Sequence, residues 1–335
     1  MGARAAHIPA HSWAVGLQQA LGLLRRRNHL DERRPGMTVT EPIAHVVPTP
    51  DRAPTGGGKP VARKRAKAGV YHTAMTVLVI LYILPVLWAV SMSLRTDAHM
   101  FDADQLIPHP ITFDHYANLL AILPDFGRYV GNTVLIAVVG TAGTLLSSSL
   151  AGYALARFTF PGQRALLMVI LLTLMVPAQV TLIPQYVIFR NLGWIDTPLP
   201  IIVPMLFGSA LPTFFFRQFF LTLPQELEDA AAVDGAGRWR TFFAVMAPLA
   251  GPAYLAMGLL TFVQLWNSFF VNSIYLQDQS QWVLTQALQS LVGRYNSQYG
   301  EIMAGVTLVS LPIVVGYIFV QRWVVRGIAF SGVAN

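Results

Sequence analysis

Long apolar stretches alternate with shorter polar segments along the chain after about residue 70. A helix needs about 20 apolar residues to cross a hydrocarbon layer about 30 Å thick. Lipid cannot hydrogen-bond open backbone groups, and these stretches are too long and too continuous for the strands of a barrel. The pattern therefore predicts an all-α membrane protein with six transmembrane helices, at 74–94, 130–154, 165–187, 199–220, 251–271 and 302–321.

The composition agrees with a surface that faces lipid. Hydrophobic residues make up 54% of the chain and charged residues 12%, against about 25% charged in soluble domains. The sequence contains no cysteine, which excludes disulfides, thiolate catalysis and cysteine-based metal sites. The net charge of +7 is spread over the ends of apolar segments, so we expect membrane lipid and not nucleic acid as a partner.

Positively charged residues near the span ends predict the orientation, because they stay on the cytoplasmic side of a membrane. Most of them fall on one side of the predicted helices, namely Arg63, Lys64, Arg65, Lys67, Arg157, Arg164, Arg217, Arg238, Arg240, Arg322 and Arg326. The other side has Arg95, Arg128, Arg190 and Arg294. We therefore expect both termini in the cytoplasm of a bacterial-type cell, with the chain in the plasma (inner) membrane.

The segment 1–70 differs from the rest in being rich in Arg, Pro and Gly, which predicts a disordered basic cytoplasmic tail. Met37 offers a second start, so 1–36 can equally be an upstream extension. The run from Thr55 to Pro60 lacks the first glycine and the hydroxyl of a phosphate-binding loop, and we expect no ATP binding by this chain. Two further regions are expected: 71–129, with the first span and an extracytoplasmic segment, and a core at 130–335.

Two features of the spans predict close packing and bends. Small residues recur in the second span, where they allow close helix approach or simply fill the bundle: Gly140, Gly143, Ser147, Ala151 and Gly152. Prolines lie in or near the third, fourth and sixth spans, where they would bend helices: Pro177, Pro184, Pro204, Pro212 and Pro312.

The polar segment 221–250 between the fourth and fifth spans predicts a short helix, a bend and a second helix. Thr222 is a possible N-cap and Pro224 suits a first turn. Negative charge is favoured in the early turns of a helix, where the segment has Glu226, Glu228 and Asp229. Gly235 can adopt the positive φ that ends a helix, and Arg238 then begins the next element. The slim alanine face at 230–232 suits entry into the cleft of a partner protein.

The same segment resembles the conserved cytoplasmic loop of binding-protein-dependent ABC importer permeases. The matching residues are Asp229-Ala230-Ala231, Asp234-Gly235-Ala236 and Val245 to Pro248; Asp229 replaces the usual Glu and Ala247 the usual Leu. The resemblance implies a coupling helix that docks on an ATP-binding subunit. It assigns that role to Glu226, Glu228, Asp229, Ala230, Ala231, Asp234, Gly235, Ala236 and Pro248.

Further matches extend the resemblance to the maltose-type (MalG-like) sugar permeases with the type I importer fold. They are Asn132-Thr133, Tyr153 to Arg157, Pro177, Pro184, Trp266-Asn267-Ser268-Phe269 and Gln321 to Gly327, with Ser268 in place of the usual acidic residue. The resemblance implies a second homologous permease, two ATP-binding subunits that hold ATP and Mg²⁺, and an extracytoplasmic solute-binding protein. It implies no catalysis and no cofactor in this chain.

Neutral polar and aromatic residues within the spans are the candidate solute path, because amides and aromatic faces match sugar hydroxyls. These residues are Gln179, Gln185, Tyr186, Gln264, Trp266 and Asn267. The alternative is that the amides bond to neighbouring helices. A sugar or sugar derivative is the expected solute, with an amino acid or a polyamine as other candidates.

Two other classes of protein fit the residues less well. An ion-coupled secondary transporter often uses a buried acid, but the six predicted spans contain no Asp or Glu, and Glu301 lies at the edge of the last. A membrane enzyme would need a nucleophile and base, or metal ligands, inside the bundle. All eight histidines lie outside the predicted spans.

Overall fold

The computed structural model describes residues 60–101, 107–294 and 298–331. The chain divides into two units, Met1–Lys67 and Ala68–Asn335, and the description below concerns the second. Helix α2 begins at Pro60, so its first turns lie within the predicted tail 1–70. The remainder of that tail, with the possible extension 1–36, lies outside the described residues.

Every regular element in the described part of the chain is a helix. The α-helices are α2 (Pro60–Ser93), α3 (Asp114–Ile122), α4 (Phe126–Arg157), α5 (Gln163–Thr173), α6 (Ala178–Asn191), α7 (Leu199–Leu206), α8 (Ala210–Thr222), α9 (Glu226–Val233), α10 (Arg238–Thr241), α11 (Ala247–Leu249), α12 (Gly251–Trp266), α13 (Phe270–Tyr275), α14 (Leu284–Arg294) and α15 (Tyr299–Ser331). The 3-10 helices η1 (Asp97–His99) and η3 (Gln279–Gln281) and the π-helix η2 (Phe242–Met246) complete the set.

The predicted spans correspond to helices long and apolar enough to cross a membrane. Within the described residues, four such stretches occur, at Tyr71–Ser93, Phe126–Arg157, Leu199–Thr222 and Tyr299–Phe319. Two bent helix pairs, α5 with α6 and α10–α11 with α12, bring the number to six when each pair is one span. The prediction of six spans is confirmed on this count.

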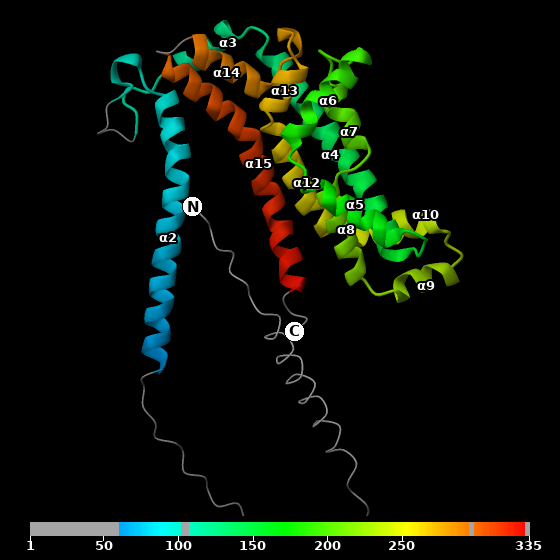
Figure 1. Ribbon diagram of the computed structural model, residues 1–335. Coiled ribbons are helices and arrows are strands. Elements are labelled where there is room, and N and C mark those ends of the chain that lie inside the picture. The colour runs from blue at the N-terminus through cyan, green and yellow to red at the C-terminus, as the bar shows by residue number, and fades with distance from the viewer. Residues whose placement is uncertain (1–59, 102–106, 295–297, 332–335) are drawn as a thin grey trace, which may run out of the picture. The chain divides into compact units, whose positions relative to one another are not determined.

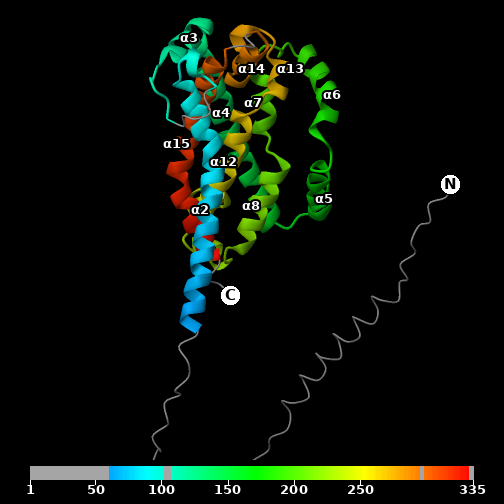
Figure 2. The ribbon, with the colours of Figure 1, turned by 90° about the vertical axis from the view of Figure 1, so that its left-hand side faces the viewer.

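Helix α4 is central to the second unit, where it packs on α7, α8 and α12, while α15 packs on α12 and α3. Helices α3, α13 and α14 gather at one end, here called the α3 end (Figures 1 and 2), and α9 and α10 lie at the other, the α9 end (Figure 1). The rest of the chain leaves residues 71–87 of α2 exposed and covers α2 mainly from residue 88 onward.

Glycines allow α4 to approach its neighbours closely, as the small-residue pattern predicted. A Cβ atom on Gly152 would lie 2.8 Å from the Arg217 backbone nitrogen and 2.9 Å from the Thr213 carbonyl oxygen, both on α8. A Cβ on Gly140 would lie 2.7 Å from a methyl group of Leu265 on α12. Since real Cβ atoms do not come so near to backbone, α4 and α8 pack directly against each other at Gly152.

The third predicted span is not a single straight helix, and a second sharp bend lies just before the fifth predicted span. Helices α5 and α6 meet at 97° across Leu174–Val176, and α11 meets α12 at 75°. Pro177 is the N-cap residue of α6, and proline pushes the residue before it out of the helical region. At the second bend, Pro252 occupies the first turn of α12. Proline has no backbone N–H, so it cannot make the hydrogen bond that would continue α11 into α12. Prolines inside α2, α6, α7 and α15 leave those helices continuous.

The fourth span is interrupted between α7 and α8 by Gly208, which has φ of 89°. Only glycine adopts this conformation without strain. The backbone amide of Ser209, which the break removes from the helix ladder, donates to the Ser148 Oγ of α4 at 3.0 Å. A side chain of the neighbouring helix thus satisfies a backbone group at membrane depth.

Buried side chains form two separate cores, one at each end of the second unit. The α3-end core contains Leu119, Tyr129, Trp266, Tyr275 and Ala304 among others. The α9-end core is smaller and aromatic, with Tyr153, Phe216, Phe220, Phe242 and Met246. Each core fixes the segments that connect the spans at its own end.

Candidate functional site

Helix α9 is the short polar helix predicted within the segment 221–250. Its first turn contains Glu226, Glu228 and Asp229, where the partial positive charge of the helix N-terminus favours carboxylates. The predicted cap is wrong: Thr222 is the last residue of α8, and its hydroxyl donates to the Phe219 carbonyl at 2.7 Å. Gln225 occupies the N-cap position instead.

The C-terminus of α9 has the turn that the sequence predicted at Gly235. This glycine has φ of 77°, the Ala236 amide donates to the Ala231 carbonyl at 2.9 Å, and the Gly235 amide donates to the Ala232 carbonyl at 3.0 Å. These two bonds are those of a Schellman motif, which stops a helix at a glycine. Helix α10 then begins at Arg238, as predicted. Pro248 is exposed in α11.

The two faces of α9 differ in exposure. Ala231 is buried and Leu227 and Glu228 are partly covered, so this face contacts the bundle. The opposite face is exposed, with Val233 at 88% and, in addition, Glu226, Asp229 and Ala230. Apolar side chains continue past α9, because Trp239 and Phe243 are exposed and their rings stack 6.3 Å apart. This end of the molecule therefore presents a slim helix beside uncovered aromatic surface.

A shallow groove runs between α9 and the start of the fifth span. Its volume is about 310 Å³, and it is lined by Leu227, Ala230, Asp234, Ala236, Arg240 and Ala244 among others. Small side chains dominate this lining. The groove and the exposed face of α9 form one continuous surface that can receive a protein segment.

The candidate solute-path residues do not form one cluster. Tyr275 on α13 donates from its hydroxyl to Gln185 at 3.4 Å, and its ring stacks on Tyr186 at 6.4 Å. Gln277 donates to the Tyr186 hydroxyl at 3.4 Å. Gln185 and Tyr186 therefore belong to an amide and aromatic group on α6 and α13. Tyr275 and Gln277 lie outside the predicted spans, so the search for polar residues within spans missed them.

The other path candidates occupy different environments. Gln264 lines a cavity of about 280 Å³ between α4, α7, α8 and α12, together with Thr144, Ser209, Thr261, Met205 and Met257. Gln179 is exposed on α6, and exposed Asn267 donates to the Val263 carbonyl at 2.9 Å. Trp266 is 2% exposed, and its indole nitrogen donates to the Val309 carbonyl of α15 at 3.2 Å. In this conformation Trp266 packs inside the α3-end core and does not face a path.

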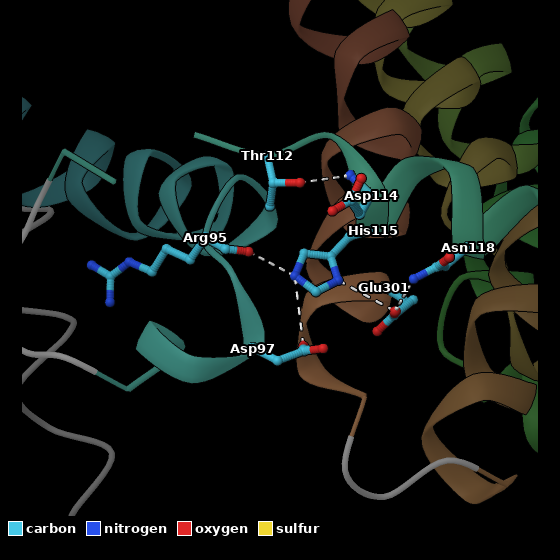
Figure 3. A network of polar contacts seen from close by, with 7 residues as sticks. All are labelled: Arg95, Asp97, Thr112, Asp114, His115, Asn118 and Glu301. Atoms are coloured by element: carbon cyan, nitrogen blue, oxygen red, sulfur yellow. Dashed lines mark hydrogen bonds and ion pairs between the residues drawn. The ribbon is translucent and has the colours of Figure 1, made fainter. Parts of the chain in front are cut away.

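A buried polar cluster at the α3 end was not predicted (Figure 3). His115 of α3 lies with Nε2 2.8 Å from the Arg95 carbonyl oxygen and Nδ1 3.3 Å from Oε1 of Glu301 in α15. Because a carbonyl only accepts, Nε2 donates, and Nδ1 shares one proton with the Glu301 carboxyl group. Asn118 also donates to Glu301 at 3.3 Å. The cluster joins the end of α2, helix α3 and the start of α15.

Asn132 and Thr133 of α4 also connect segments at the α3 end. The Asn132 side chain donates to the Trp282 carbonyl at 3.0 Å, and the Leu284 amide donates to the Thr133 hydroxyl at 2.9 Å. These two residues, which match the permease pattern, thus anchor the segment 280–284 to α4. Within the described residues, no group of three or more His, Asp or Glu side chains is placed to hold a metal ion.

Comparison with known proteins identifies the class of this fold and site. The family described as "Binding-protein-dependent transport system inner membrane component" matches residues 143–330, more than half of the chain. The chain belongs to this family and is thus the membrane permease component of an ABC-type import system. The match covers α9 and the exposed surface beside it.

Individual relatives support the same class. The chain is 31% identical over 261 residues to the diacetylchitobiose uptake system permease protein NgcG of Streptomyces coelicolor, covering 77% of this chain and 86% of that protein. It is 34% identical over 274 residues to the lactose transport system permease protein LacG of Rhizobium radiobacter, covering 80% and 97%. The fold matches a chain of a bacterial ABC transporter that imports the acidic polysaccharide alginate, with TM-score 0.68, 22% identity and coverage of 81% and 99%.

Proposed function

We propose that this chain imports a sugar or sugar derivative in an ATP-driven transporter. The relatives NgcG and LacG are named for diacetylchitobiose and lactose uptake, and both match most of this chain. The amide, hydroxyl and aromatic groups of the path candidates suit sugar hydroxyls better than a charged solute. An amino acid or a polyamine has no comparable support among these relatives.

The proposed assembly contains four kinds of subunit. Next to this chain stand a second homologous permease and two ATP-binding subunits, which hold ATP and Mg²⁺ and hydrolyse the ATP. A solute-binding protein delivers the solute from outside. The excess of arginine near the α9 end, with Arg157, Arg217, Arg238 and Arg240, favours the cytoplasm for that end. The binding protein then meets the α3 end.

The observation that carries the proposal is the exposed face of α9. A helix with alanine at 230–232 is narrow enough to enter a cleft. Its exposed carboxylates, Glu226 and Asp229, and the neighbouring aromatic surface offer polar and apolar contacts, whereas Glu228 lies on the covered face. We assign to α9 and the turn at Gly235 the docking on an ATP-binding subunit. Closure of those subunits would move α9, and the spans would then reorient between outward and inward access.

The docking role can be tested by adding bulk to the exposed face. Ala230→Trp places a large ring where only a methyl group projects, without disturbing buried residues. We expect this variant to lose co-purification with the ATP-binding subunits and ATP-dependent uptake of radiolabelled lactose and diacetylchitobiose. Ala121→Trp is the matched control, because Ala121 is an exposed alanine of α3 at the opposite end.

Three outcomes decide the proposal. Loss of the ATP-binding subunits in Ala230→Trp alone supports docking through α9. Retention of these subunits and of uptake in that variant would refute it. Solute uptake by the purified chain alone, driven by an ion gradient, would refute the ATP-driven mechanism as a whole.

A further inference from the structure

Arg157 and Glu228 are far apart in the sequence and form an ion pair in the structure. Arg157 is the last residue of α4, and Glu228 lies in the first turn of α9. The Arg157 Nε and Glu228 Oε1 atoms are 2.9 Å apart, and the side chains are 10% and 19% exposed. Limited exposure reduces screening by water, so the two charges attract each other more than in a surface ion pair, while burial adds a desolvation cost to both.

The end of α4 holds both sides of the link between α8 and α9. Arg157 also donates from Nη2 to the carbonyl of Leu223, the residue after α8, at 2.7 Å. Tyr153, one helical turn before Arg157 on α4, lies close enough to Glu228 for its hydroxyl to favour the charged form of that carboxyl group and lower its pKa. The start of the 223–225 connection and the first turn of α9 are therefore both bonded to the end of α4.

The charge of Glu228 depends on these partners. Burial raises the pKa of the Glu228 carboxyl group above its usual value, and Arg157 and Tyr153 act in the opposite direction. Loss of either partner would leave a partly buried carboxylate with less compensation. The pair is thus a specific contact and not an incidental meeting of two exposed charges.

The position of the pair places it between the docking surface and the bundle. Glu228 lies on the covered face of α9, opposite the exposed Val233. Arg157 ends the helix that packs on α7, α8 and α12. The ion pair therefore joins α9 to the helix at the centre of the bundle.

We propose that Arg157 and Glu228 are positioning residues that transmit the movement of α9 to α4. The inference rests on the proposed function, because it needs a partner that moves α9. It assigns the transmission to a charge pair within this chain, separate from the contacts that bind the partner.

The test compares solute imported per ATP hydrolysed in proteoliposomes containing the assembled transporter and its binding protein. The probes are radiolabelled lactose and diacetylchitobiose. We expect Glu228→Gln and Arg157→Gln to keep the ATP-binding subunits but to lower this ratio about tenfold, a typical size for coupling between sites. The reversed pair, Arg157→Glu with Glu228→Arg, should recover most of the ratio.

A second readout does not require a transported solute. The chain has no cysteine, so spin labels at Gln225→Cys and Leu146→Cys report the distance between α9 and α4 alone. With ATP and vanadate, the distribution of distances between the two labels should stay narrow in the parent and broaden in Glu228→Gln. The matched control is Arg128→Gln, which removes an exposed ion pair (Arg128 Nη1 to Asp125 Oδ1, 3.5 Å) from the other end of α4.

The possible failures are distinguishable. If the parent complex neither assembles with ATP-binding subunits nor uses ATP, the proposed function fails. Suppose that the parent couples transport to ATP hydrolysis, and that Glu228→Gln keeps both the parent's ratio of solute to ATP and its narrow distribution of label distances. Then the transmission role alone is overturned. If both single variants fail to assemble, the reversed pair decides: recovery of coupling supports the role, and an assembled but uncoupled reversed pair refutes it.

Discussion

The two ends of this permease differ in how many of their polar groups are paired with other segments of the same chain. At the α3 end, His115, Glu301, Asn132, Thr133 and Asp196 make polar contacts between segments far apart in sequence. At the α9 end, the helix that meets the proposed partner has one covered face, with Ala231 and Glu228, and one exposed face.

This difference indicates where another protein must complete the structure. At the α9 end, Val233, Trp239 and Phe243 are 88%, 70% and 53% exposed, and they adjoin a polar helix that lipid would not cover. Uncovered apolar surface next to charged groups is typical of a protein interface. The α3 end also has exposed apolar side chains, such as Phe101, Ile107 and Phe113, but its polar groups bond its own connecting segments to each other.

The largest expected effect comes from the buried cluster of the α3 end. Glu301→Ala removes the buried carboxylate partner of His115, in a site where the two residues are 5% and 2% exposed, and leaves the imidazole beside the exposed Asp97 carboxylate, at 3.9 Å. We expect a loss of about 3 kcal/mol in stability, as for other broken buried pairs. Thermal unfolding of the purified transporter measures it.

An exposed ion pair near the same end is the control for this prediction. Asp125→Ala removes the partner of Arg128, with side chains 45% and 54% exposed, and should cost less than about 1 kcal/mol. Equal effects of the two substitutions would contradict the view that the buried cluster fastens the α3 end.

Close helix packing near the α9 end should give the next largest effect. Gly152→Ala forces a methyl group against the α8 backbone, and we expect a loss of about 2 kcal/mol from overpacking. Gly131→Ala, in the same helix, meets no atom within 4 Å and should stabilise α4 by up to about 1 kcal/mol. Thermal unfolding of the two variants, which should shift in opposite directions, tests the contrast.

The smallest effect is expected at Asp278, in the turn before η3. The Asp278 carboxylate accepts from the Ser280 amide at 2.8 Å, and this bond lowers the pKa of Asp278 below 3.8. An acid with a lowered pKa stabilises the fold above its unfolded value and loses that contribution as the pH falls through its folded value.

Asp278→Asn should therefore unfold at a slightly lower temperature than the parent at pH 7. The difference should shrink as the pH falls below about 3.8, the unperturbed value. A difference that grows on acidification would show that the Ser280 bond is not its source.

The fold followed from local pattern to a large degree. Apolar length predicted the six spans, the small-residue series predicted the approach at Gly152, and the DGA sequence at 234–236 predicted the turn at Gly235. Each of these depends on a few neighbouring residues. Span boundaries were less exact because helices α2, α4 and α15 extend beyond the apolar stretch.

The polar contacts between distant segments could not be predicted in the same way. His115 and Glu301 are 186 residues apart, and each alone has the appearance of a polar residue in a loop or at a span edge. Arg157 was counted for orientation and Glu228 for its place in α9, but no local signal pairs them. Trp266 matched the path by residue type, whereas packing against α15 placed it in the core.

The break at Gly208 has a consequence for how the fourth span can move. The Ser209 amide bonds to a hydroxyl group of α4 and not to a carbonyl one turn back in its own helix. The angle between α7 and α8 can therefore change about this glycine while the amide keeps its partner. A rotation at this glycine would therefore expose no bare backbone donor to hydrocarbon.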